Sequence, residues 1–171
     1  MGDVLIRHAG YDEDFFLWTQ EQAEVLRSAA DERTNLLIDW ENVAEEIESL
    51  GKRDRRGCES LIGKIIVHLL KMKYWPDDEP MRHWKTEIKA FRKKLERIMG
   101  DSGSLRRRLP EFVLSEQKGA IEEVLDSLAT LPGNPDRLKL RGTLESCVLT
   151  PDNIVDPTFF PDRNPLGAPP P

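Results

Sequence analysis

The chain has little cysteine: Cys58 and Cys147 are its two thiols, and they lie far apart in the sequence. Because they form no CxxC pair, the pattern predicts neither a zinc site nor a disulfide framework, and free thiols are expected. A chain of 171 residues does not need such cross-links, since a domain of this length can bury roughly 70% of its unfolded surface. The sequence therefore predicts a core held together by apolar packing.

The signatures of several enzyme classes are absent as well. There is no GxSxG around a serine and no glycine-rich phosphate loop. His8 and His83 are isolated, and no glutamate lies three residues before any histidine, as the carboxylate-bridged dimetal bundles would require. We predict no catalytic residue, no cofactor and no bound metal, and we expect a binding protein rather than an enzyme.

No apolar run approaches the length that crosses a membrane, and the start of the chain lacks an apolar segment of signal-peptide length. Charged residues make up 33% of the chain and hydrophobic residues 39%. This composition is typical of a soluble, folded protein and not of a disordered one. We expect a cytoplasmic protein that has no membrane partner.

What the sequence does contain is a strong helical periodicity between Asp39 and Trp75. At 100° per residue its apolar positions keep one phase, which marks a buried helix face. This stripe consists of Trp40, Ile47, Leu50, Cys58, Leu61, Ile65 and Met72. Because the phase does not shift across Gly51, we expect one helix over 40–74, with at most a kink there. The alternative is a helix that ends at Gly51 and a second one capped by Asp54.

Similar patterns predict a helix on each side of this one. The first is expected over about 12–30, with Asp12 as its cap, and its buried stripe is Phe15, Thr19, Ala23 and Leu26. The third begins near Pro80, which suits a first helical turn, and ends at Gly100. Its heptad-like seam is Trp84, Ile88, Phe91, Leu95 and Ile98. Apolar seams of this kind predict helices that pack side by side.

The rest of the chain is less regular. Ser104 is expected to cap a short turn, Pro110 to break or kink the fourth helix, and 111–131 to continue it until the turn at 132–135. A further helical stretch over 136–147 and a capped turn at Thr150 precede an arm whose apolar plugs are Val155, Phe159 and Phe160. We therefore predict an all-α antiparallel bundle of at least four helices over 1–163, as one domain, with an irregular C-terminal arm and a flexible proline-rich tail over 164–171.

Charge is distributed unevenly along the chain. Residues 1–50 carry a net −10, 51–109 carry +9 and 110–171 carry −5, so that the whole chain is −6. The basic faces 52–56, 92–97 and 106–108 make a nucleic-acid-associated factor one alternative. An acidic first segment can instead pair with a basic middle one inside the chain. Since acidic residues outnumber basic ones, and the aromatic residues lie in the core stripes, a solvated or acid-paired face is the stronger expectation.

His68 is the most unusual position, because it lies inside the apolar stripe of the long helix. Antiparallel pairing across the turn at 75–80 would bring it near Trp84 and Glu87. We predict a hydrogen bond between His68 and Glu87 that satisfies a buried imidazole. The wider candidate polar cluster adds Arg92 and Glu46, the one early glutamate that reaches the edge of the stripe. The alternative is a metal-dependent or hydrolytic enzyme centred on His68.

Three ordered blocks of the sequence resemble a known family. They are Tyr11–Trp18, Asp39–Gly51 and His68–Lys71 followed by Tyr74, with further likeness at Trp84, Ile88, Arg92, Cys147 and Pro161. Together these blocks resemble the bacterial family called domain of unknown function 29. The chain departs from its pattern at Gly57 and Gly63, and at Val148-Leu149 after Cys147, where the family often has Pro-Tyr. The resemblance implies a small, mostly helical protein, and it implies no established activity.

From these observations we expect a non-enzymatic interaction or adaptor module. The seam on the third helix and the length of the second leave apolar surface for a protein partner or for a second copy of the chain. Self-association through helices is therefore the prediction. Nucleic acid is a weaker expectation as a partner.

Overall fold

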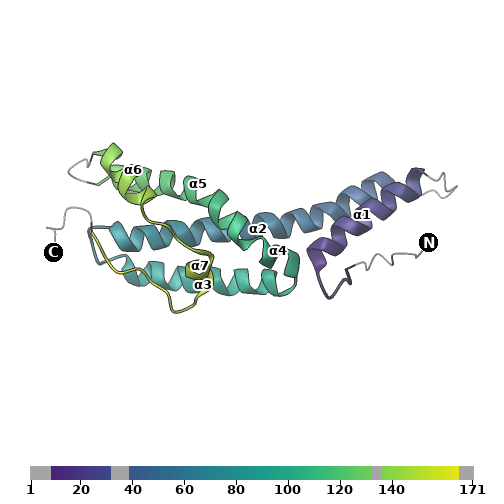
Figure 1. Ribbon diagram of the computed structural model, residues 1–171, viewed down its shortest axis with the longest axis horizontal. Coiled ribbons are helices and arrows are strands. Elements are labelled where there is room, and N and C mark those ends of the chain that lie inside the picture. Colours follow the sequence, from purple (N-terminus) through teal and green to yellow (C-terminus); the bar gives the residue numbers. More distant parts are fainter. Residues whose placement is uncertain (1–8, 32–38, 132–135, 166–171) are drawn as a thin grey trace, which may run out of the picture. The chain divides into compact units, whose positions relative to one another are not determined.

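The structure, a computed structural model, describes residues 9–31, 39–131 and 136–165. In these ranges it contains seven helices and no strand beyond one isolated bridge between Asp14 and Ser102. The helices are α1 (Phe15–Asp31), α2 (Trp40–Tyr74), α3 (Met81–Gly100), α4 (Gly103–Arg107), α5 (Leu109–Ala129), α6 (Arg137–Glu145) and α7 (Pro151–Val155). The predicted all-α antiparallel bundle with an irregular C-terminal arm is confirmed (Figure 1).

The chain forms two compact units. The first combines the chain up to Cys58 with Arg97–Arg108, and the second combines Glu59–Glu96 with the chain from Leu109 onward. The expectation of one domain over 1–163 stays a prediction. The turn predicted at 132–135 and His8 lie outside the described residues.

The continuous second helix is confirmed, since α2 runs from Trp40 to Tyr74 without a break. In the first unit α1 lies along this helix (Figure 1). Their contact explains why α2 has a glycine at position 51. A Cβ atom at Gly51 would lie 2.1 Å from Thr19 Oγ1. Thr19 is itself buried and donates its hydroxyl to Phe16 O over 2.7 Å. Glycine therefore does not end the helix but lets the two helices approach closely.

The start of α1 was predicted wrongly. The cap is Asp14 and not Asp12, because Asp14 Oδ1 accepts a hydrogen bond from the Leu17 backbone N–H at 3.1 Å. Asp14 also accepts from the Ser104 backbone N–H at 2.5 Å and from the Ser104 hydroxyl at 2.7 Å. Ser104 thus binds Asp14 instead of capping α4, whose N-cap position is Ser102. One buried carboxylate joins the starts of α1 and α4.

In the second unit, α2 is buried on more than the predicted stripe. Ile65 and Met72 are buried as expected, but between them Ile66, Val67, Leu69 and Leu70 are buried too. A helix that is apolar around most of its circumference is surrounded by other elements. The seam of α3 is used inside the chain as well, since Ile88 and Leu95 are buried. The prediction that this seam is left for a partner is therefore wrong at Ile88 and Leu95.

The break before α5 lies at Arg108, so that Pro110 falls in the first turn of α5 instead of interrupting it. Proline lacks a backbone N–H, and in the first turn of a helix that N–H would have no partner within the helix, so Pro110 is tolerated there. The predicted helix at 136–147 is present as α6, with Asp136 as its cap. The predicted capped turn is also present, as α7 with a capping box between Thr150 and Asn153.

The C-terminal arm is anchored differently from the prediction. The buried plug of α7 is Ile154, whereas Val155 is exposed and Phe159 and Phe160 are half-buried. Asn164, expected in a flexible tail, donates its backbone N–H to Lys73 O at 2.7 Å. The structure does not describe residues 166–171.

Candidate functional site

The predicted contact between His68 and Glu87 is present in the second unit. His68 Nε2 lies 2.7 Å from Glu87 Oε2, and its Nδ1 lies 2.7 Å from the backbone oxygen of Lys64. Because a carbonyl oxygen can only accept, Nδ1 carries a proton. Both ring nitrogens are thus engaged within the chain, and neither is free to take a proton from a substrate.

Two neighbours of His68 were not predicted. His83 Nε2 lies 3.2 Å from the same oxygen of Glu87 that binds His68, one helical turn earlier on α3. The His83–Glu87 spacing of i, i+4 is visible in the sequence and could have been noticed. The ring beside His68 is Phe91, edge to face at 5.6 Å between centroids, where Trp84 was predicted.

The other members of the predicted cluster lie elsewhere. Trp84 packs edge to face against Trp75, with ring centroids 5.5 Å apart. Glu46 is exposed and belongs to the first unit. Among the described residues, no three His, Cys, Asp or Glu side chains are arranged to hold a metal ion. The cluster therefore reduces to His68 and Glu87, joined by His83.

Arg92 belongs neither to this cluster nor to an exposed basic face, because it is buried with 5% of its surface exposed. Its Nε donates to Ile154 O at 2.8 Å, its Nη1 to Phe159 O at 3.0 Å and its Nη2 to Asn153 O at 2.7 Å. Burial lowers the pKa of this guanidinium. Arg92 thus fixes the C-terminal arm through backbone carbonyls. The sequence did not predict this role, because Arg92 stands in a run of basic residues.

Some of the predicted basic residues pair within the chain. Lys52 lies 2.9 Å from Glu48, and hydrogen bonds from Lys52 and Arg27 lower the pKa of Glu48. Arg107 lies 3.8 Å from Asp14. The basic faces 52–56 and 106–108 therefore serve in part to neutralise the acidic residues of the first unit.

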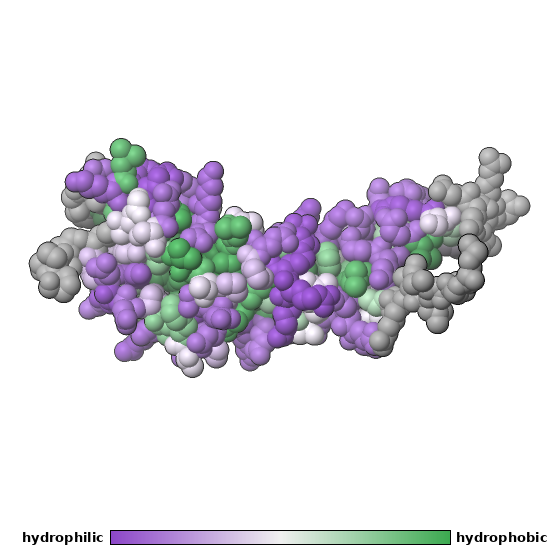
Figure 2. Space-filling model, in the orientation of Figure 1, coloured by the Kyte–Doolittle hydropathy of each residue, from purple (hydrophilic) through white to green (hydrophobic). Residues whose placement is uncertain are grey.

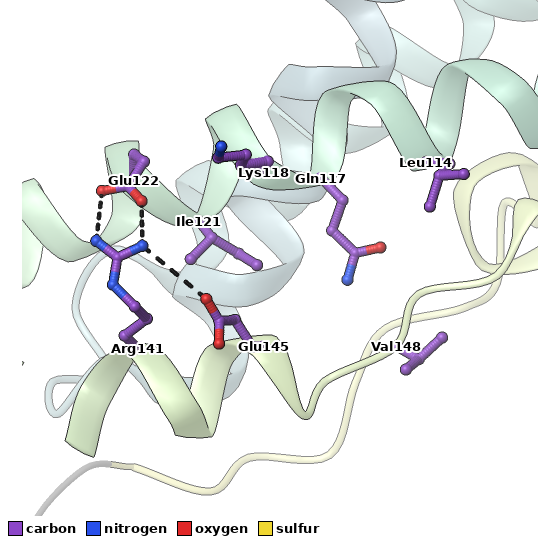
Figure 3. A pocket seen from close by; sticks show the side chains of 8 residues that line it. All are labelled: Leu114, Gln117, Lys118, Ile121, Glu122, Arg141, Glu145 and Val148. Carbon is purple, nitrogen blue, oxygen red and sulfur yellow. Dashed lines mark hydrogen bonds and ion pairs between the residues drawn. The ribbon is translucent and has the colours of Figure 1, made fainter. Parts of the chain in front are cut away.

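A groove that the sequence did not predict lies in the second unit between α5, α6 and the segment that follows α6. We call it the α5–α6 groove. It is lined by Leu114, Gln117, Lys118, Ile121, Glu122, Arg141, Glu145 and Val148. Its volume is ≈ 430 Å³. Figure 3 shows Leu114 and Val148 facing each other across one end, with Ile121 pointing inward from α5.

The two ends of this groove differ in chemistry. At one end, Leu114 is 77% exposed and Val148 is 73% exposed. At the other, Arg141 donates from Nη1 and Nη2 to the two carboxylate oxygens of Glu122, and Glu145 lies 3.9 Å from the same arginine (Figure 3). These hydrogen bonds raise the pKa of Arg141 and lower that of Glu122. The groove therefore combines an open apolar end with a polar end that is already neutralised.

Apolar surface is visible in this part of the molecule, between α6 and α7 as the second unit is viewed in Figure 2. Periodicity could not identify the groove, because Leu114 stands outside the buried stripe of α5 and Val148 follows the end of α6. Only the packing of α6 on α5 brings them together. The signal in the sequence was the presence of Val148-Leu149 after Cys147, at the place where the chain departs from the family pattern.

Comparisons with known proteins agree with this fold. Residues 11–160 match the family described as Domain of unknown function DUF29. The chain is also similar to a solved alpha-helical protein of unknown function from Rhodospirillum rubrum, at 24% identity and a TM-score of 0.69, over 90% of this chain and 93% of that one. A comparison with curated proteins finds no match. No described helix has the length and apolar character needed to span a membrane.

Proposed function

We propose that this chain, which belongs to the family described as Domain of unknown function DUF29, acts as a non-enzymatic interaction module whose α5–α6 groove binds a second copy of itself. The family and the solved relative are both described as of unknown function. The proposal therefore depends on the surface of this chain. It keeps the predicted self-association but moves it from the seam of α3 to the α5–α6 groove.

One observation carries the proposal: the groove supplies both a hollow and the apolar side chains that could fill one. Leu114 and Val148 project at its open end, next to a space of ≈ 430 Å³. Two copies related by a two-fold axis present the same surface to each other, so such a surface must be self-complementary. Leu114 of one copy can then enter the groove of the other, and the reverse contact forms at the same time.

The charges at the groove are compatible with this contact. Each chain carries a net −6, which opposes association. At the groove, however, Arg141 already neutralises Glu122, and so the polar end adds little repulsion. Lys118 and Glu145 line opposite walls of the groove. A two-fold axis can place the lysine of one copy beside the glutamate of the other.

The test is the mass of the purified protein by sedimentation over a range of concentrations. We expect a dimer that Leu114→Glu weakens by a hundredfold or more. Burying a leucine contributes about 1.5–3 kcal/mol, and a symmetric contact contains it twice. Leu138→Glu is the matched control, because Leu138 is an equally exposed leucine, at 80%, on α6 but does not line the groove.

A monomer at all concentrations would overturn the proposal, as would a dimer that both variants weaken equally. Circular dichroism checks that each variant is folded. If the wild type is monomeric, the groove would have to bind a different protein.

The two alternative functions expected from the sequence are tested by other measurements. Metal content tests an enzyme centred on His68, and salt-dependent retention on nucleic acid tests the basic faces. Since both nitrogens of His68 are engaged, the first alternative has less support.

A further inference from the structure

The second unit contains a contact between a thiol and an amine that the proposed function does not use. Lys73 Nζ, at the end of α2, lies 3.5 Å from Cys147 Sγ, in the segment after α6. Cys147 is 8% exposed. Its sulfur is therefore not an isolated surface thiol, because a nucleophilic side chain from a distant part of the sequence is held against it.

The surroundings restrict how this pair can move. The Tyr74 hydroxyl donates to Thr143 O at 3.4 Å, and Lys73 Nζ lies 5.4 Å from the centre of the Tyr74 ring. Gln117 Nε2 donates to Cys147 O at 3.4 Å, which fixes the backbone of the cysteine. Burial, together with the neighbouring Cys147, raises the pKa of Tyr74, so its hydroxyl stays neutral. Lys73 therefore supplies a basic nucleophile held beside the sulfur.

We propose that Lys73 and Cys147 form an oxidative modification site, at which a peroxide converts the contact into a covalent nitrogen–sulfur bond. A cysteine sulfenic acid is known to condense with a nitrogen nucleophile to give a sulfenamide. Here the nitrogen comes from a side chain that already touches the sulfur. The proposal is independent of the proposed self-association.

The reaction balances in two steps. Hydrogen peroxide oxidises the Cys147 thiol to S–OH while its O–O bond breaks, and one water leaves. Lys73, after its ammonium has given a proton to solvent, attacks the sulfur as an amine. The N–S bond forms, the S–OH bond breaks, and the hydroxyl group leaves as a second water with a proton from the amine. The product has lost two hydrogen atoms relative to the reduced protein, and a thiol reductant reverses it.

The experiment treats the full-length protein with hydrogen peroxide and maps its peptides by mass spectrometry after digestion with a protease that does not cut at lysine. We expect one linked peptide that joins Lys73 to Cys147, lighter by two hydrogens, and its loss after reduction. Cys58 is an internal control, because it is fully buried in the first unit and should not form a link to a lysine.

Two matched variants test the role of the amine. Lys73→Arg keeps the positive charge but removes the nucleophilic amine, so the peptide linked at position 73 should disappear. Links from Cys147 to any other lysine should form at least about tenfold less than the wild-type link, because a held amine reacts as if highly concentrated. Lys71→Arg, two residues earlier on α2, should leave the yield unchanged. Unfolding in urea before oxidation should abolish the link. Oxidation of Cys147 to sulfinic acid without a linked peptide would overturn the proposal, as would a link from Cys147 to another lysine that forms in the Lys73→Arg variant with the wild-type yield.

Discussion

At the scale of single residues, His68 shows how a polar side chain is accommodated in an apolar helix face. Its two nitrogens bind Lys64 O and Glu87, and the Phe91 ring covers its edge. His68 is half-buried rather than buried as predicted, and a polar group shielded from water stabilises a fold only while its partners are in place. The imidazole therefore belongs to the packing of α2 against α3.

We predict that His68→Ala lowers the free energy of unfolding by about 2–3 kcal/mol, through lost hydrogen bonds and lost packing. The matched control is His83→Ala, which removes the other imidazole bound to Glu87. His83 is 70% exposed on its side chain, against 16% for His68. The control should cost less than about 0.5 kcal/mol, as exposed substitutions usually do. Urea denaturation measures the free energy of unfolding of both variants. Equal losses would show that the hydrogen bonds and packing of His68 are not what stabilises the site.

Glu116 is a residue whose charge opposes folding. Burial and the neighbouring Glu59 raise its pKa, so the folded chain holds this proton more tightly than the unfolded chain. Such a group destabilises the fold when it is ionised, and the penalty disappears as the pH falls to the unfolded value of about 4.3.

We therefore predict that Glu116→Gln raises the melting temperature at pH 7 and that this gain shrinks towards zero near pH 4. Thermal denaturation of both proteins across that range is the measurement. Glu123→Gln, on the same helix but exposed, serves as the control for removal of one negative charge. A gain that is the same at every pH would contradict the assignment to ionisation.

The sequence could predict the part of the candidate site whose residues are close together in the sequence. His68 and Glu87 lie on helices joined by a short turn, so helical phase alone places them face to face. Arg92 lies one turn beyond Ile88 on the same side, but its partners are carbonyls of Asn153, Ile154 and Phe159. The pattern of side chains in a sequence does not show which backbone carbonyls will accept hydrogen bonds. The contact between Arg92 and the C-terminal arm therefore could not be predicted.

At the scale of elements, close contact between helices depends on where a Cβ atom can be tolerated. Gly51 in α2 faces Thr19, whereas Gly119 in α5 has nothing within 4 Å of an added Cβ. In an open helix position alanine is favoured over glycine by about 1 kcal/mol. The two positions should therefore respond with opposite signs.

We predict that Gly119→Ala stabilises the protein by about 0.5–1 kcal/mol, while Gly51→Ala destabilises it by about 1–3 kcal/mol because the new methyl group overlaps Thr19 Oγ1. Combining Gly51→Ala with Thr19→Ser should restore little of the lost stability. Serine removes a methyl group but retains the hydroxyl oxygen with which the new Cβ clashes. Combining Gly51→Ala with Thr19→Ala should restore more of the lost stability, because alanine removes that oxygen. Denaturant midpoints compare the set, and a stabilised Gly51→Ala variant would show that α1 does not approach α2 so closely.

The elements were predictable where their signals were local. The constant phase across Gly51 gave α2 correctly, and the Thr150-Asn153 pair gave the capping box of α7. The start of α1 was misplaced because Asp12 and Asp14 are equally good caps in isolation. The choice is made by Ser104, which binds Asp14 from a distant part of the sequence. Helical periodicity cannot predict an interaction between residues that are so far apart in the sequence.

At the scale of the whole molecule, the charge that looked like a basic surface is partly internal. Arg92 is buried, and Lys52 pairs with Glu48. The chain as a whole is acidic, with a pI of about 5.2. Copies of such a chain repel one another at neutral pH, so the proposed dimer depends mainly on apolar contact, with the pairing of Lys118 and Glu145 as a smaller contribution.

The proposed dimer should therefore respond to salt in a characteristic way. Raising the ionic strength from about 0.01 M to about 0.15 M shortens the distance over which charges act from about 30 Å to about 8 Å. The repulsion between two chains of net charge −6 then falls, while the burial of Leu114 and Val148 is not weakened. We predict that the dimer becomes tighter with added salt, by several-fold in the dissociation constant. Sedimentation at the two salt concentrations measures this change. A dimer that salt dissociates would mean that charge pairs, and not the apolar end of the α5–α6 groove, hold the copies together.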